Sequence, residues 1–200
     1  MTRTFFMTTA AALAAVSFSS SAQASDATRY TIDSSHAQTI FSYNHLGLST
    51  TYGMFSGWDG EILFDAAAPE NSSVTVQIPT LSMFTGWEAR DAHFNSADFL
   101  DTAEESLVTF TSTAIEVTGE TTALITGDLT VNGITAEVVL DTVMNYNGEH
   151  PLPNMNGVPT LGFTATTEIL RSDFDAGAFA PFVSDAVDVT ISFEAMQADM

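Results

Sequence analysis

The sequence predicts an all-β protein, an antiparallel barrel of about eight strands with one short helix between strands. Apolar and polar side chains alternate most clearly along residues 161–169 and 187–195, as expected for strands with one buried face. Tight-turn signals separate successive segments, and Asn132-Gly133 is the strongest because both residues tolerate a positive φ. Sequential strands joined by such turns favour an antiparallel sheet, and their number favours closure into a barrel.

The expected elements follow one another along the chain. The alternation predicts strands at residues 29–33, 37–44, 52–65, 74–78, 107–117, 121–131, 135–144, 161–169 and 187–195. Glycines within residues 52–65 mark bends or bulges of the kind found at the corners of a closed sheet. In residues 88–97 apolar and polar side chains do not alternate with a period of two, and this stretch could form about two turns of helix. Three segments are expected to be turns or irregular loops: residues 65–72, 145–159 and 171–185.

Residues 1–24 are predicted to be a secretory signal peptide. Arg3 precedes an apolar run over residues 5–16, and Ala22-Gln23-Ala24 forms an Ala-x-Ala cleavage site. This run is too short and too rich in Ala and Ser for a stable membrane span, and no later run approaches the ~18 apolar residues of a membrane helix. We therefore expect cleavage near Ala24, an exported protein without membrane insertion, and one domain over residues 25–200.

The composition excludes several classes of partner and site. The chain has 25 acidic residues against 4 Lys and Arg, and its net charge is −21. Nucleic acid and anionic lipid surfaces would be repelled, so they are poor partners, and we expect no nucleic acid partner. The absence of Cys excludes disulfides, thiolate chemistry and Cys-ligated metals. We interpret the acids as a solvated surface, and the absence of Lys motivates the hypothesis of a saline habitat.

The best candidate site is the segment Thr85–Asp101, where charged, polar and aromatic side chains gather within a regular strand pattern. Arg90, Asp91 and His93 lie within four positions, and Trp87 precedes them. In one interpretation these polar residues form a structural cluster in which each buried charge is paired. In the other, Arg90 or His93 donates hydrogen bonds to a quinone, phenol or phosphate head group, and the planar guanidinium is the better donor to anions.

Other side chains give weaker signals. His36 and His45 could join His93 as metal ligands, but the spacing is not a compact ligand motif, so we expect no metal site. Neither a G-x-S-x-G motif nor a phosphate-binding Gly loop is present, so we expect no catalysis and no cofactor. Three aromatic residues of the predicted strands suit either a packed core or the wall of an apolar cavity: Phe41, Phe110 and Phe163.

Several short motifs resemble, in the same order, those of the YceI-like family. They are YTIDSSH at 30–36, HLG at 45–47, RDAHFNSADF at 90–99, GDLTVNGIT at 127–135 and RSDF at 171–174. The resemblance implies a periplasmic, lipocalin-like antiparallel β-barrel whose interior takes a polyisoprenoid or isoprenoid-quinone-like chain, in a family not established as enzymes. Three places depart from the family pattern: Glu105-Ser106-Leu107 stands where a Pro is usual, Asn132 where a His is common, and Asp175 where a Gly is usual.

One hypothesis is preferred and two alternatives stay open. The preferred function is a periplasmic lipid-binding protein that carries or sequesters a polyisoprenoid or quinone-like chain, with affinity from burial of the tail at about 0.8 kcal/mol per CH₂ before the costs of binding. The alternatives are a non-catalytic periplasmic stress or structural protein with a packed barrel, and an enzyme acting on isoprenoid lipids. A homodimer is compatible with each. The candidate ligand-binding residues are Arg90, Asp91, His93, His36, His45, Trp87, Phe41, Phe110 and Phe163.

Overall fold

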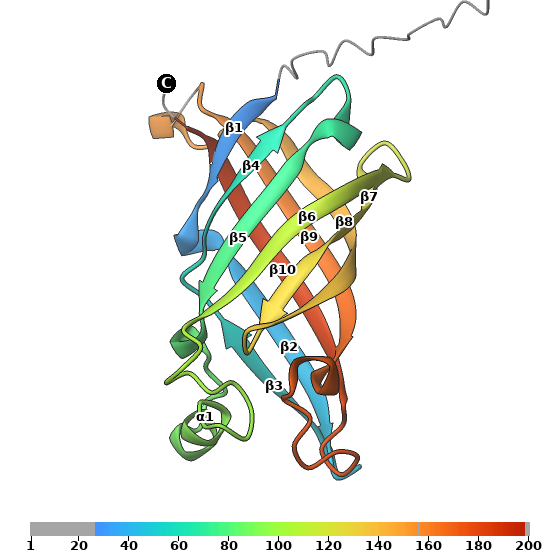
Figure 1. Cartoon of the computed structure of the whole chain (residues 1–200). Coiled ribbons are helices and arrows are strands. Elements are labelled where there is room, and N and C mark those ends of the chain that lie inside the picture. Colours follow the sequence, from blue (N-terminus) through green and yellow to red (C-terminus); the bar gives the residue numbers. More distant parts are fainter. Residues whose placement is uncertain (1–26, 156, 199–200) are drawn as a thin grey trace, which may run out of the picture.

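The computed structural model describes residues 27–155 and 157–198, in which a 10-stranded antiparallel sheet is the main element (Figure 1). The strands are β1 (Thr28–Ile32), β2 (Gln38–His45), β3 (Ser49–Phe55), β4 (Asp59–Phe64), β5 (Ser73–Pro79), β6 (Leu107–Val117), β7 (Thr122–Val131), β8 (Ile134–Glu149), β9 (Pro159–Leu170) and β10 (Ala186–Gln197). The one α-helix of the described residues is α1 (Glu88–Phe94). Short 3₁₀ turns are η1 (Ser34–His36), η2 (Pro69–Asn71), η3 (Thr80–Ser82), η4 (Pro153–Met155) and η5 (Arg171–Phe174).

Eight of the strands close the barrel. Their order is β1-β4-β5-β6-β7-β8-β9-β10, and β10 pairs back onto β1, where Ala195 lies opposite Ile32. The β2–β3 hairpin extends this ring, because β2 pairs with residues 188–192 of β10 beyond the end of β1. β1 and β2 therefore form two halves of one wall strand, and β4 and β3 form two halves of the next. The predicted eight-stranded antiparallel barrel with one short helix is confirmed.

The structure differs from the expected elements at two places. The strand expected over residues 52–65 is broken between β3 and β4, where Gly57 adopts φ +70°. The loop expected over residues 145–159 is shorter, because β8 runs to Glu149. A shift of register between Met144 and Tyr146 interrupts the period of two there, so the sequence pattern hides the end of this strand. The Asn132-Gly133 hairpin turn is confirmed, with φ +52° and +68°.

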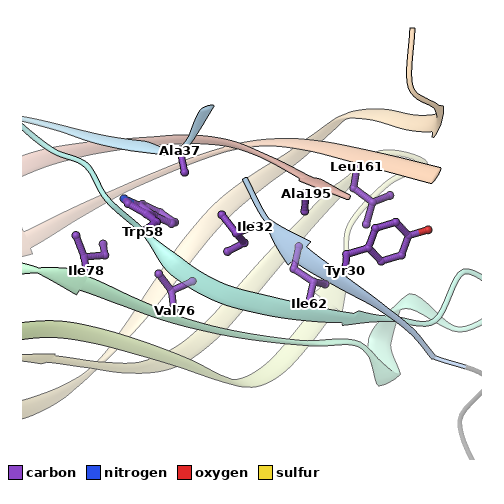
Figure 2. Packing of buried hydrophobic residues seen from close by; sticks show 9 residues of the cluster. All are labelled: Tyr30, Ile32, Ala37, Trp58, Ile62, Val76, Ile78, Leu161 and Ala195. Atoms are coloured by element: carbon purple, nitrogen blue, oxygen red, sulfur yellow. The ribbon is translucent and has the colours of Figure 1, made fainter. Parts of the chain in front are cut away.

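Apolar side chains fill one part of the barrel, where β1, β4 and β5 face the start of β9 and the end of β10. Leu161 and Ala195 pair across β9 and β10, and both are 0% exposed. Figure 2 shows the side chains converging between these strands. The cluster consists of Tyr30, Ile32, Ala37, Trp58, Ile62, Val76, Ile78, Leu161 and Ala195. Full burial of one large aliphatic side chain contributes about 1.5–3 kcal/mol, so this cluster is a main source of stability.

No helix within residues 27–155 and 157–198 is long and apolar enough to cross a membrane. The predicted signal peptide lies outside the described residues, so its cleavage near Ala24 stays a prediction.

Candidate functional site

An apolar cavity of about 320 Å³ lies inside the barrel. Its wall takes alternate residues of each strand, such as Ala165, Thr167 and Ile169 of β9, because successive side chains of a strand point to opposite faces. The lining reaches from Arg171 at the end that carries α1 to Glu120 in the β6–β7 turn at the other end (Figure 1). We call the first end, with α1, the β2–β3 turn and the loop of residues 171–185, the mouth. The volume is within the range of small-ligand pockets.

The inward-facing side chains around the cavity are not fully packed. Val108, Phe110 and Leu129 point inward and line the cavity, yet each is only half-buried. Close-packed side chains in a filled barrel would bury one another almost completely. Water finds few hydrogen-bond partners along an apolar wall, so this space suits an apolar ligand better than it suits water.

Three aromatic residues that suited either a packed core or a cavity wall line the cavity: Phe41, Phe110 and Phe163. The ring of Phe41 lies over Gly53, where an added Cβ would come within 2.1 Å of it. The ring of Phe110 lies over Gly127, where an added Cβ would come within 2.4 Å. Glycine at these two positions lets the rings lie along the wall, which keeps the middle of the barrel open.

Two residues that line the cavity each carry a polar atom that is buried without a hydrogen-bond partner among the described residues. These atoms are Thr39 Oγ1 and Trp58 Nε1. Both lie beside β10: Thr39 is opposite Ile191, and the Trp58 ring centroid is 5.7 Å from that of Phe193. A buried polar group without a partner costs about 1–3 kcal/mol. A ligand oxygen that accepts from the Trp58 N–H would remove that cost.

Arg90 and Asp91 bind the segment that leads into α1. The Asp91 carboxylate accepts hydrogen bonds from the backbone N–H of Thr85, at 2.8 Å, and from its hydroxyl. Arg90 donates through Nε to Thr85 Oγ1 at 2.8 Å and through Nη2 to the Thr85 carbonyl at 2.7 Å. Trp87 lies beside them, with its ring centroid 5.9 Å from Arg90 Cζ. None of these side chains is among the described residues that line the cavity. The geometry therefore favours the interpretation of Arg90 and Asp91 as a structural cluster. Direct contact of Arg90, Asp91 or Trp87 with a ligand stays a prediction.

His93 supports the mouth from outside. Its ring makes edge contacts with Phe99 at 5.0 Å and with Phe179 at 5.7 Å between centroids. Its Nε2 lies 3.1 Å from Asp98 Oδ2. Phe99 is a lining residue whereas His93 is exposed, so His93 acts on the cavity through Phe99, and its contact with a ligand also stays a prediction.

His36 and His45 lie apart from this cluster. His45 ends β2, where its backbone bridges to Val183. His36 lies in η1, and its Nδ1 is 2.7 Å from Asp33 Oδ2. This hydrogen bond raises the pKa of His36 and lowers the pKa of Asp33. The side-chain oxygen or nitrogen atoms of Asp33, His36 and Glu194 lie within 4.8 Å of one another, which is a spacing that could hold a cation. The hydrogen bond between Asp33 and His36 already explains why these two side chains lie close together. Neither His36 nor His45 is among the described lining residues.

Arg171 is the cation of the cavity wall, and it was not among the expected site residues. All of its N–H groups are used: Nε donates to one carbonyl, and each Nη donates to two. The acceptors are backbone carbonyls of the loop before β10, from Ala176, Ala178, Val183 and Ser184. Its Cζ lies 5.7 Å from the Phe99 ring centroid, and burial lowers its pKa. The signal available in the sequence was the scarcity of cations, because Arg29, Arg90 and Arg171 are the only ones after the predicted signal peptide.

Asn132 joins three segments at the mouth. Its side-chain amide donates to the carbonyl of Phe99, beyond α1, and at 3.1 Å to the carbonyl of Phe174 in η5. The β7–β8 turn, the α1 segment and the loop before β10 therefore meet at one side chain. This position is where the family resemblance leads one to expect a His.

Comparison with known proteins gives a consistent assignment. The model of the YceI-like domain matches residues 30–195. A UPF0312 protein of Pseudomonas savastanoi pv. phaseolicola is 41% identical over 170 residues, which cover 84% of this chain and 86% of the relative.

Solved structures share the barrel. The Campylobacter jejuni YCEI protein superposes with a TM-score of 0.69 and 28% identity, covering 78% of this chain and 90% of that one. A polyisoprenoid binding domain from Saccharophagus degradans superposes with a TM-score of 0.65 at 15% identity, covering 84% of this chain and 98% of that one, and this likeness concerns the fold. The family model spans most of the chain and the sequence identity to the relative extends over the whole barrel, so the chain belongs to the YceI-like family.

Proposed function

We propose that this protein is a periplasmic binding protein that holds a polyisoprenoid or isoprenoid-quinone-like chain inside its barrel, as a carrier or a sequestering protein. The observation that carries the proposal is the apolar cavity, whose wall runs along the barrel and whose inward side chains are only partly buried. A slim apolar chain would bury its CH₂ groups there, each contributing about 0.8 kcal/mol before the costs of binding.

The polar atoms of the wall suit a ligand with at least one oxygen. The Trp58 N–H is a donor without a partner among the described residues, and a quinone carbonyl is an acceptor. Arg171 places a positive charge at the mouth, but its N–H groups already donate to carbonyls of the loop before β10. It would therefore attract a ligand oxygen through the electrostatic field of its charge rather than through a direct hydrogen bond. The isoprenoid class is further supported by the barrel of the Saccharophagus degradans domain, which is named for polyisoprenoid binding.

A packed structural barrel does not fit this interior, because side chains that fill a barrel leave no cavity of about 320 Å³. The periplasmic location is supported by the signal-like pattern of residues 1–24. We propose binding without catalysis, which is supported by a cavity lining in which apolar side chains predominate.

Organic extraction and mass spectrometry of the purified protein test the proposal. We expect a long-chain isoprenoid lipid at near-stoichiometric amount after expression with export to a bacterial periplasm. Protein that carries no such lipid, and that also takes up no added isoprenoid quinone, would refute it.

A further inference from the structure

The most exposed apolar side chains of the described residues gather at the mouth. The six largest exposures among large apolar residues run from 57% at Phe84 to 81% at Leu48. All six lie on segments at the mouth end of the barrel (Figure 1). We call them the apolar rim, and they are Leu48, Tyr52, Leu81, Phe84, Trp87 and Phe182. Exposed apolar side chains that occur singly need no explanation, whereas a group at one end of a molecule indicates an interaction surface.

Backbone hydrogen bonds place the three rim segments side by side. On one side of the β2–β3 hairpin, the Leu46 N–H donates to the Phe182 carbonyl at 2.7 Å. On the other side, Met54 and Phe84 exchange two hydrogen bonds, at 2.9 and 2.8 Å. The hairpin therefore lies between the loop that carries Phe182 and the segment that carries Phe84. Figure 1 shows the hairpin tip and the loop before β10 together at the lower end of the barrel.

The same three segments are free of acidic residues. The chain contains 25 Asp and Glu, yet residues 34–58, 71–87 and 176–184 contain none. Every rim residue falls within these ranges. Acids begin again just outside them, at Asp33, Asp59 and Asp185. Carboxylates are costly to move from water toward hydrocarbon, so rim segments without them are suited to contact with lipid, and the nearby acids Glu88 and Asp98 lie outside these segments, on the α1 side.

We propose that the apolar rim docks the mouth onto an uncharged or zwitterionic lipid surface, from which the barrel takes up its ligand. The uptake step rests on the proposed function, because a polyisoprenoid chain resides in membranes rather than in water. The rim adjoins one end of the cavity lining: Phe182 precedes the lining residue Val183, and Trp87 begins the segment that carries the lining residue Phe99. Leu and aromatic side chains enter the interface of a bilayer without a membrane-spanning helix.

The charge decides which lipid surface fits. A net charge of −21 would be repelled by the negative potential of an anionic leaflet, whereas a zwitterionic surface carries no such potential. A second copy of the chain is the competing occupant, but two chains that each carry a net charge of −21 would repel one another.

Flotation with phosphatidylcholine vesicles that contain no isoprenoid tests docking by itself. We expect the mature protein to float with the vesicles, and the Leu48→Ser/Phe182→Ser variant to partition at least ~10-fold less, because two apolar side chains no longer enter the lipid interface. The matched control is Leu152→Ser, which changes a side chain of 54% exposure in the loop before β9 and should float like the parent. Phosphatidylglycerol added to the vesicles should weaken binding.

Three results would overturn the proposal: a parent protein that stays in the aqueous fraction, a rim variant that floats as well as the parent, or binding that rises with phosphatidylglycerol. Sedimentation of the same proteins identifies the competing occupant, because a dimer that the rim substitutions dissociate, without vesicle binding, would assign the rim to a second copy. The vesicles carry no ligand, so failure to float would leave the proposed cavity function standing. An empty cavity on extraction would likewise leave the flotation result standing.

Discussion

At the scale of single residues, the cavity wall combines apolar surface with very few polar contacts. Trp58 is 4% exposed, packs against Phe193 and keeps its indole N–H without a partner among the described residues. A buried donor of this kind selects for ligands with an acceptor, because a ligand that lacks one leaves the donor unpaired. Trp58 is therefore the residue most able to distinguish a quinone from a plain hydrocarbon.

Replacement of Trp58 by Phe removes the N–H and keeps an aromatic ring against Phe193. We expect Trp58→Phe to raise the Kd for a long-chain isoprenoid quinone about fivefold to tenfold, since a net hydrogen bond contributes about 1 kcal/mol. The Kd for a polyisoprenoid hydrocarbon of the same length should change less than about twofold, because the hydrocarbon cannot accept that bond. Equilibrium partitioning of both labelled ligands measures the difference. An equal loss for both would mean that Trp58 serves packing alone.

The Asp33–His36 pair predicts a pH dependence. The raised pKa of His36 means that its stabilising contribution is full below the ordinary value of 6.5 and is lost as the pH rises through the folded-state pKa. The lowered pKa of Asp33 means that its contribution is present above 3.8 and is lost as the pH falls through the folded-state pKa. Asp33→Asn should therefore lower the pKa of His36 in an NMR titration and remove the fall in stability above pH 6.5 that the pair causes. A His36 titration that does not move would contradict the pairing.

At the scale of elements, the mouth is built from segments with little regular structure of their own. The loop before β10 is anchored by Arg171, and α1 is anchored by the contacts of Arg90 and Asp91 with Thr85. Asn132 connects both to the β7–β8 turn. Two of the three cations after the predicted signal peptide, Arg90 and Arg171, thus hold backbone segments in place at the mouth.

Arg171→Lys should disorder the loop before β10. An ammonium group is compact and cannot reach the four carbonyls that the guanidinium bonds, so we expect the free energy of unfolding to fall by about 2–3 kcal/mol. Hydrogen exchange of residues 176–184 should become faster, and urea denaturation measures the stability. The matched control is Arg29→Lys, which alters an exposed ion pair with Glu61 and should cost less than about 1 kcal/mol. Equal losses for the two variants would contradict the anchoring role.

Much of the element structure follows from local pattern. The two-residue alternation of apolar and polar side chains places most of the strands and assigns their faces, so Phe41, Phe110 and Phe163 could be expected on the inner face of the barrel. The Asn132-Gly133 turn follows from the positive φ that both residues tolerate. The helix α1 could be expected because the strand-like alternation of apolar and polar side chains stops in that stretch.

Other features depend on contacts between distant residues and could not be read in the same way. Arg90 and Arg171 look alike in the sequence, and only the fold shows that Arg171 reaches the carbonyls of a loop while Arg90 stays with Thr85. Whether the barrel is hollow depends on how rings settle over Gly53 and Gly127, which composition does not determine. That the Trp58 N–H has no partner within residues 27–155 and 157–198 likewise depends on how its surroundings fold.

At the scale of the whole molecule, charge and shape set two further expectations. A net charge of −21 without Lys means that carboxylates repel one another across the surface. Salt screens this repulsion, shortening the Debye length from about 30 Å at 0.01 M to about 10 Å at 0.1 M.

The thermal midpoint should therefore rise with NaCl. Between about 0.01 M and 0.5 M we expect an increase of about 4 °C or more, equivalent to at least ~1 kcal/mol for a domain of this size. Calorimetry across the salt series measures it. A midpoint indifferent to salt would contradict a repulsive surface and count against the saline-habitat hypothesis.

The cavity offers a matched pair of substitutions on one strand. Val138 of β8 lines the cavity, whereas Val139 points outward and is 46% exposed. Trp at position 138 would enter the space that a ligand needs, while Trp at position 139 would extend into solvent. Because the inward site faces open volume, both variants should fold, with unfolding free energies within about 1 kcal/mol of the parent protein.

Extraction and mass spectrometry of the parent, Val138→Trp and Val139→Trp proteins, each exported to a bacterial periplasm, test the central claim most directly. A ligand chain held inside the barrel predicts near-stoichiometric isoprenoid lipid in the parent and in Val139→Trp, and at least ~10-fold less in Val138→Trp, since the lost apolar burial exceeds about 1.4 kcal/mol. Equal lipid in all three folded proteins, or none in the parent, would contradict it.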